Sequence, residues 1–290
     1  MQELGNIFEK GCLVQLSISV WGGSAKINEE IAKEALGSEW AKARKLLVDR
    51  EALKPVEKIR NSARQYLREK SLPFPIDGVM FIPFESVEKV DEKLKDLAWD
   101  FSLAVDSFQA GYENAVEVAK TVLGSLFDEN DYPQEIRRKF NFNWRFFLME
   151  APGKNSLLSP ELVAREQEKF LETMKEAREL AVEALRVEFG QLVKNACEKL
   201  APAKEGEKKI FRNSLVRNFG EFFETFKERN CFGDEELERL VEEARKVISG
   251  VEAEDLRQDE GLKQTIARGM GKIGEELVAI AKPGRKLDLS

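Results

Sequence analysis

Two long amphipathic segments constrain most strongly what this chain can fold into. In residues 84–127, apolar side chains recur every three or four positions, which is the period of an α-helix. In residues 159–200, a start of Ser159, Pro160 and Glu161 supplies a capping hydroxyl, a ring in the first turn and an acid at the positive end of the helix dipole. An unbroken helix of either segment would be roughly 60 Å long. Because one apolar stripe alone is poorly stabilised in water, we expect the two helices to pack as a long antiparallel hairpin, similar to a coiled coil.

Three short segments predict a small antiparallel β-sheet at one end of this hairpin. Residues 13–21 and 140–149 alternate between two faces, and residues 79–82 form a short apolar run after a turn. The predicted class is therefore α+β, predominantly α. We expect a long-helix and small-sheet domain over residues 1–202, a linker at 203–209 and a C-terminal helical region over 210–290. The last helix carries several glycines, which predict fraying or a bend there.

The composition excludes many kinds of chemistry. The chain has no histidine, which removes Ser-His-Asp triads, Cys-His dyads and histidine-based zinc sites. Its three cysteines form no CxxC pair, and no carboxylate lies in an apolar setting that would raise its pKa. We therefore expect a protein that is not an enzyme, with no catalytic residues, no metal and no cofactor.

Hydropathy and charge give expectations about location. No run of about 18 apolar residues is present, so no membrane span is expected. The first ten residues do not resemble a signal peptide, which favours a cytoplasmic location. The net charge of -7 argues against unspecific binding of nucleic acid by the whole surface, although a local basic patch could still bind it.

Basic side chains concentrate in one predicted helix. Lysine and arginine outnumber the acids over residues 41–70, and Arg60, Arg64 and Arg68 follow one another at intervals of four on one helical face. Two interpretations remain open. The arginines pair with acids of the same chain, or they form a surface for phosphate groups or an acidic partner.

A second basic group surrounds the strand predicted at 140–149. Alternate aromatic residues of that strand share one face, which could stack on unpaired bases but is more typical of a core. Together the two groups give a candidate surface for a partner or for nucleic acid: Arg60, Arg64, Arg68, Arg137, Arg138, Lys139 and Arg145.

Several stretches resemble a known family. They are LVQLSISVWGG, REALKPVEKIRNSARQYL, LPFPIDGVMFIP, DYPQEIRRKFNFNWRFF and FGEFFETFKERNCFGDEEL. They are similar to the uncharacterised proteins of domain of unknown function 3150, which bacteria, phages and mobile elements encode, sometimes near MoxR-like AAA+ ATPases. The resemblance implies a helical partner or adaptor for a nucleotide-driven machine supplied by another gene. It assigns no catalytic residues.

These observations lead to two functional hypotheses. The first is a non-enzymatic scaffold or adaptor that self-associates as a homo-oligomer or binds a protein partner, an AAA+ ATPase being the partner that the resemblance implies. The alternative is a nucleic-acid-binding protein that uses the basic helix and the arginine-flanked aromatic strand.

Overall fold

The computed structural model describes residues 7–151, 153, 158–201, 214–251 and 254–280. The predicted linker at 203–209 lies outside these residues. The chain divides into two compact units. Unit 1 comprises Met1–Leu13, Lys70–Ser86 and Phe147–Ser290, and unit 2 comprises Val14–Glu69 and Val87–Phe146. The predicted boundary at residue 202 does not coincide with this division, because the long helix before it and the helices after it share unit 1.

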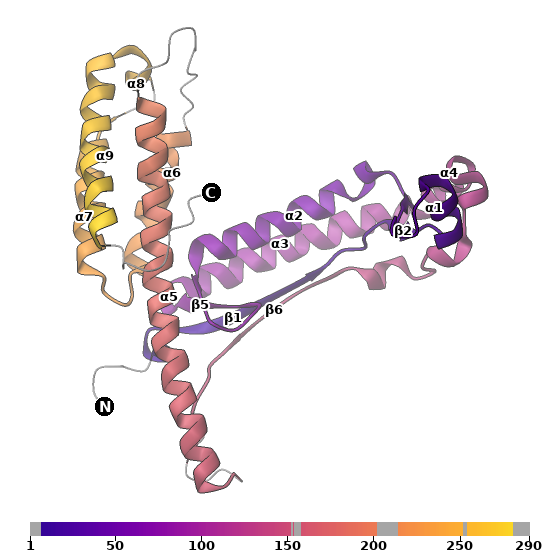
Figure 1. Cartoon of the computed structure of the whole chain (residues 1–290), viewed down its shortest axis with the longest axis horizontal. Coiled ribbons are helices and arrows are strands. Elements are labelled where there is room, and N and C mark those ends of the chain that lie inside the picture. Colours follow the sequence, from indigo (N-terminus) through magenta and orange to yellow (C-terminus); the bar gives the residue numbers. More distant parts are fainter. Residues whose placement is uncertain (1–6, 152, 154–157, 202–213, 252–253, 281–290) are drawn as a thin grey trace. The chain divides into compact units, whose positions relative to one another are not determined.

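The fold is mainly α-helical with a small antiparallel sheet, which confirms the predicted class (Figure 1). The four-stranded sheet has the order β4-β5-β1-β6, so β4 and β6 are its edges. Its strands are β1 (Gly11–Ser19), β4 (Leu72–Pro73), β5 (Val79–Pro83) and β6 (Asn141–Phe147). A separate antiparallel pair joins β2 (Ser24–Lys26) to β3 (Arg44–Leu46). The three predicted strands are present as β1, β5 and β6, whereas the short strands β2, β3 and β4 were not predicted.

The second predicted long helix is confirmed as α5 (Pro160–Leu200), which is unbroken over 41 residues. The Ser159 side chain accepts a hydrogen bond from the backbone N–H of Leu162 at 3.3 Å, as the capping sequence predicts. From its middle onward α5 buries one apolar face. That face consists of Met174, Ala177, Ala181, Leu185, Phe189, Val193, Ala196 and Leu200.

Helices from the C-terminal part of the chain cover this face in unit 1. α5 packs against α9 (Glu260–Ile280), α6 (Ser214–Arg229) and β4, and α9 also packs against α7 (Glu235–Ile248) and the short α8 (Asp255–Gln258). The prediction named the first long helix as the partner of this face, and that was wrong for the part of α5 buried in unit 1. The C-terminal helices carry apolar faces of their own, which must also be covered, and periodicity alone does not say which faces meet.

The glycines of α9 differ in how closely they lie to neighbouring helices. α9 is continuous from Glu260 to Ile280, so the predicted bend or fraying is not observed within it. A Cβ atom at Gly269 would lie 3.1 Å from side-chain carbons of Val247 on α7, and one at Gly274 would lie 3.5 Å from Val193 on α5. At Gly269, glycine lets α9 approach α7 closely, whereas a Cβ atom at Gly274 would make an ordinary van der Waals contact.

The first predicted long helix is two helices, so the prediction of one rod over 84–127 was wrong. α3 (Phe84–Ala110) ends before Gly111, and α4 (Tyr112–Leu123) follows. The N–H of Gly111 donates to the carbonyl of Phe108, only three residues back, at 3.2 Å, which tightens the last turn. α4 then buries Tyr112 and Ala119 in a separate cluster with residues of the 47–53 segment. This tertiary packing, together with the low helix propensity of glycine, explains the break.

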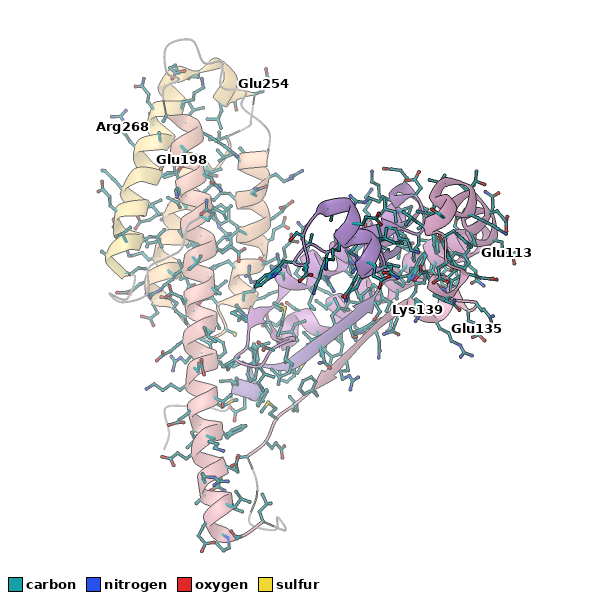
Figure 2. All side chains as sticks on the ribbon, turned by 45° about the vertical axis from the view of Figure 1, so that its right-hand side comes forward. Glu113, Glu135, Lys139, Glu198, Glu254 and Arg268 are labelled. Carbon is teal, nitrogen blue, oxygen red and sulfur yellow. The ribbon has the colours of Figure 1, made fainter. Side chains whose placement is uncertain are left out.

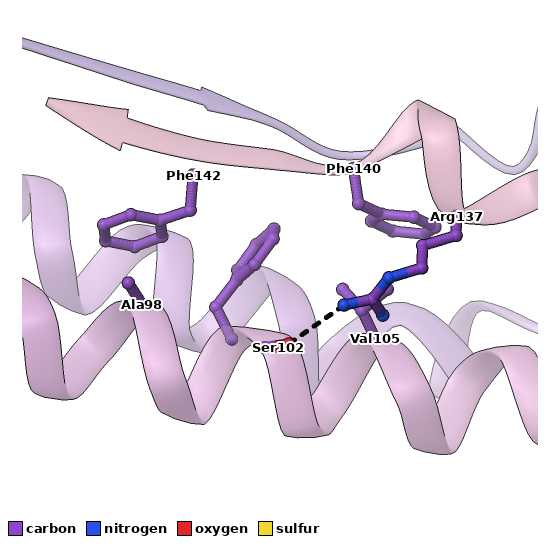
Figure 3. Close-up of a pocket in the computed structure, with 7 residues that line it drawn as sticks. Ala98, Ser102, Val105, Arg137, Phe140 and Phe142 are labelled. Carbon is purple, nitrogen blue, oxygen red and sulfur yellow. Dashed lines mark hydrogen bonds between the residues drawn. The ribbon is translucent and has the colours of Figure 1, made fainter.

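The remaining elements of unit 2 include the basic helix. α1 (Glu29–Leu36) is short, and α2 (Arg50–Lys70) lies beside α3, on the same side of β1 and β6 (Figures 1 and 3). The Tyr66 hydroxyl of α2 donates to the carbonyl of Lys89 on α3 at 3.4 Å. Four single 3₁₀ turns complete the described elements: Ile7–Glu9, Gly124–Leu126, Glu129–Asp131 and Ile136–Lys139.

Candidate functional site

The aromatic face of β6 packs against α3. Phe140 and Phe142 point from the strand toward the helix (Figure 3), and the ring centroids of Phe142 and Phe101 are 5.5 Å apart. The indole N–H of Trp144 donates to the Asp91 carboxylate at 2.8 Å. These half-buried aromatic side chains form part of the interior of unit 2. This packing agrees with the core interpretation of the strand.

A small pocket of about 190 Å³ lies between α3 and the start of β6, and Arg137 is its one charged lining residue (Figure 3). The Arg137 guanidinium donates to the Ser102 hydroxyl at 3.0 Å and forms an ion pair with Asp106. The other lining residues are Ala98, Phe101, Val105, Phe140 and Phe142. Apart from Arg137 and the Ser102 hydroxyl that it contacts, the walls of this pocket are apolar.

The three arginines predicted on α2 have different surroundings. Arg60 is half-buried, lies 3.9 Å from Glu57 and donates to the side chain of Asn61 at 3.3 Å. Arg64 and Arg68 are exposed, and neither makes an ion pair or a side-chain hydrogen bond with any other residue that the structure describes. Arg64 and Arg68 are therefore available to contact a partner.

The basic residues before and within β6 divide in the same way. Arg138 pairs with Glu135, and Arg137 is held at the pocket. Lys139 and Arg145 are exposed, and within the described part of the chain they have no ionic partner. Figure 2 shows Lys139 and Glu135 at the surface of unit 2. Four of the seven predicted residues thus remain available, on two different surfaces: Arg64 and Arg68 on α2, and Lys139 and Arg145 on β6 and the turn before it.

The strand pattern also places the predicted Arg145 on one sheet face with four polar residues that were not among the predicted site residues. Asn141, Asn143 and Arg145 of β6 are exposed, as are Ser17 and Ser19 of the neighbouring β1. They alternate with side chains that face α3, so they lie on the opposite side of the sheet. We call these five residues the outer sheet face. The sequence indicates this face, because polar residues alternate with apolar residues along both strands.

The solvent side of α3 carries two large apolar side chains that were also missed. Trp99 is 68% exposed and Leu103 is 52% exposed. The exposed acids Asp96 and Asp100 lie on the same side of the helix, three residues before Trp99 and Leu103 respectively. Neither acid pairs with a cation among the described residues. We call these four residues the outer α3 face. Its sequence signal was that Trp99 falls outside the buried apolar line of the helix.

A well-buried ion pair lies in unit 1 and links three helices. Arg186 of α5 donates to the two carboxylate oxygens of Asp234 at 2.6 and 2.9 Å and to the carbonyl of Ile280 at 2.5 Å. Asp234 also accepts the N–H of Leu237 at 3.2 Å and so caps α7. The Asp234 bond raises the pKa of the Arg186 guanidinium, which keeps it charged. Every group here has a structural partner, so we assign this contact to stability.

Metal-ligating side chains and cysteines are two further kinds of candidate group in the described part of the chain. No group of three or more histidine, cysteine, aspartate or glutamate residues there could hold a metal ion. Burial raises the pKa of the Cys12 and Cys231 thiols to about 11, so both stay protonated near neutral pH. Among the helices that the structure describes, none has an apolar stretch sufficient to span a bilayer.

Comparison with known proteins identifies the family. No curated protein and no solved structure matches the chain. A family model described as "Protein of unknown function (DUF3150)" matches residues 8–205, which include β1, all of unit 2 and α5. The chain therefore belongs to the DUF3150 family.

Proposed function

We propose that this protein is a non-enzymatic scaffold or adaptor that binds a protein partner through the outer α3 face. The observation that supports this proposal most is the exposure of Trp99 and Leu103 one helical turn apart. Tryptophan contributes heavily to binding energy at protein interfaces, and adjacent exposed apolar side chains are typical of interaction sites.

The acids beside these side chains indicate the chemistry of the partner. Asp96 and Asp100 have no cation among the described residues, so a partner segment with lysine or arginine beside an apolar anchor would complement both features. Opposite charges at the rim of an interface speed association and select against acidic partners. Burying the exposed part of one large apolar side chain contributes about 1–2 kcal/mol, so Trp99 and Leu103 supply an anchor of useful size.

The family resemblance supports one kind of partner. The described residues include no group that we place in catalysis, and the resemblance to proteins encoded near MoxR-like AAA+ ATPases supports an adaptor for such a machine. Self-association through the same face is the second form of this proposal, since the chain also carries basic exposed side chains on α2.

Paired capture experiments test the proposal. The tagged wild-type chain and a Trp99→Asp/Leu103→Asp variant are used to capture proteins from cells that encode the chain naturally. Val278→Asp is the matched control, because Val278 is 71% exposed on α9 in unit 1. We expect one captured protein to be lost with the double variant and retained with the control. Capture that is equal for all three chains would contradict the proposal.

Nucleic-acid binding is the second candidate function. The observation that favours it is that Arg64, Arg68, Lys139 and Arg145 are exposed without an acidic partner in the described residues. Filter binding at two salt concentrations tests it, because binding through phosphate contacts weakens steeply as salt rises. No binding at low salt would exclude it.

A further inference from the structure

We propose that the outer sheet face binds the backbone of a single-stranded nucleic acid. This inference rests on the second candidate function and names its site. The face is formed by Ser17 and Ser19 of β1 and by Asn141, Asn143 and Arg145 of β6. All five side chains are exposed. None of them makes a side-chain hydrogen bond with another described residue.

The charge of this face differs from that of the chain. Acids outnumber bases overall, 53 to 46, yet the exposed positions of β6 and of residues 17–19 include no carboxylate. Arg145 lies near one end of β6, and Lys139 lies just before its other end. The acids closest in sequence lie outside the two strands: Glu135, which pairs with Arg138, and the exposed Glu150, three residues after β6. An anionic ligand therefore meets two unpaired cations and no carboxylate from either strand.

The spacing of the side chains suits an extended, repeating ligand. Alternate residues of a strand lie about 6.7 Å apart, which is similar to the separation of successive phosphates along an extended nucleic-acid strand. Asn141 and Asn143 can each both donate and accept hydrogen bonds, and the serine hydroxyls of β1 can do the same. The face thus presents a row of hydrogen-bonding groups between two cations.

The length of the side chains favours a single strand over a duplex. Serine and asparagine are short, so they reach only backbone groups that lie close to the flat sheet. A flexible single strand can follow the sheet over several phosphates, whereas the backbone of a stiff duplex curves away from a flat surface. Phe140 and Phe142 point toward α3, and Phe147, which alternates with the same parity as Arg145, is partly buried against the core of unit 1, so aromatic stacking is not part of this site. Binding should therefore be independent of sequence and strongly dependent on salt.

Fluorescence anisotropy with a labelled 20-nucleotide oligo(dT) and a duplex of equal length tests this inference. The variants are Asn141→Ala/Asn143→Ala, Arg145→Gln and, as a matched control on the other surface, Arg64→Gln/Arg68→Gln. We expect oligo(dT) to bind more tightly than the duplex. The asparagine variant should weaken binding about fivefold at unchanged salt slope, because neutral hydrogen bonds are lost. Arg145→Gln should reduce the slope of log K against log salt by about 0.7, the value for one phosphate contact on a single strand.

The outcomes separate this site from the function on which it rests. No binding of either probe by the wild-type chain at low salt would overturn the nucleic-acid function and this inference together. Wild-type binding that only the α2 variant weakens would overturn this inference and leave the function standing. Equal affinity for the duplex would overturn the assignment to single strands. Circular dichroism of each variant shows that the fold is retained.

Discussion

The Arg186–Asp234 ion pair is the residue-level contact on which unit 1 depends most. The Asp234 side chain is only 4% exposed, so removing its cation leaves a carboxylate buried without an ionic partner. We expect Arg186→Met to lower the free energy of unfolding by about 3–5 kcal/mol. Urea denaturation followed by helical circular dichroism measures this change.

A double variant distinguishes a lost ion pair from lost packing. Asp234→Asn removes the charge, so Arg186→Met/Asp234→Asn should be more stable than Arg186→Met alone. If the free energy of unfolding of Arg186→Met lies within about 1 kcal/mol of the wild-type value, the ion pair does not link the helices of unit 1 as its geometry indicates.

The cysteines give a second residue-level prediction. Burial raises the pKa of Cys12 and Cys231 from the ordinary value of 9.0 to about 11, which reduces the thiolate fraction near pH 8 about 100-fold. In the folded protein at pH 8, we expect both thiols to react slowly with Ellman's reagent, and faster as the pH rises toward 11. In urea, all three thiols should react rapidly. Rapid reaction of two thiols in the native state would refute this burial.

At the residue scale, the sequence identified the basic residues of the candidate surface better than it identified the residues that each of them contacts. It identified the seven basic candidates, but only the structure shows that Arg137 is held by Ser102 and Asp106 and that Arg64 is not paired within the described residues. Ion pairs between distant segments depend on packing, which local spacing does not contain. The outer sheet face was predictable from alternation, since the polar half of β6 is as regular as the aromatic half.

The elements show why some boundaries could be predicted. α5 begins where Ser159 and Pro160 provide the cap, because capping is a local property of the sequence. The break at Gly111 depends on the cluster into which α4 folds, so periodicity alone extended the helix beyond it. The strands β2 and β3 have three residues each, too few for a reliable alternation.

Two glycines of α9 provide a matched test at this scale. A Cβ atom at Gly271 would meet no atom within 4 Å, whereas one at Gly269 would lie 3.1 Å from Val247. We expect Gly271→Ala to raise the free energy of unfolding by up to about 1 kcal/mol through helix propensity. Gly269→Leu should lower it, because the larger side chain forces α9 away from α7.

Thermal unfolding followed by circular dichroism orders the three proteins. The account requires Gly271→Ala to melt above wild type and Gly269→Leu to melt below it. Destabilisation by both substitutions in equal measure would mean that close packing at Gly269 is not specific.

At the scale of the whole molecule, α5 needs the C-terminal helices. Leu185, Phe189 and Val193 are at most 2% exposed, and they belong to the core that α6 and α9 complete. A fragment of residues 1–202, the domain predicted from the sequence, would expose this face at a cost of about 1.5–3 kcal/mol for each large side chain. We expect it to aggregate or to melt well below the full chain.

Size-exclusion chromatography and thermal melting compare this fragment with residues 1–280, the control that retains every described helix. A monomeric 1–202 fragment with the melting temperature of the control would restore the predicted domain boundary.

The central claim, that the outer α3 face binds a protein, is tested most directly by site-specific photo-crosslinking. A photoreactive phenylalanine derivative replaces Leu103 or, as the control, Val278, in cells that encode the chain naturally. We predict a crosslinked product at position 103 that Trp99→Asp abolishes, with no such product at position 278. Equal crosslinking from both positions, or a product at 103 that Trp99→Asp leaves unchanged, would contradict the account.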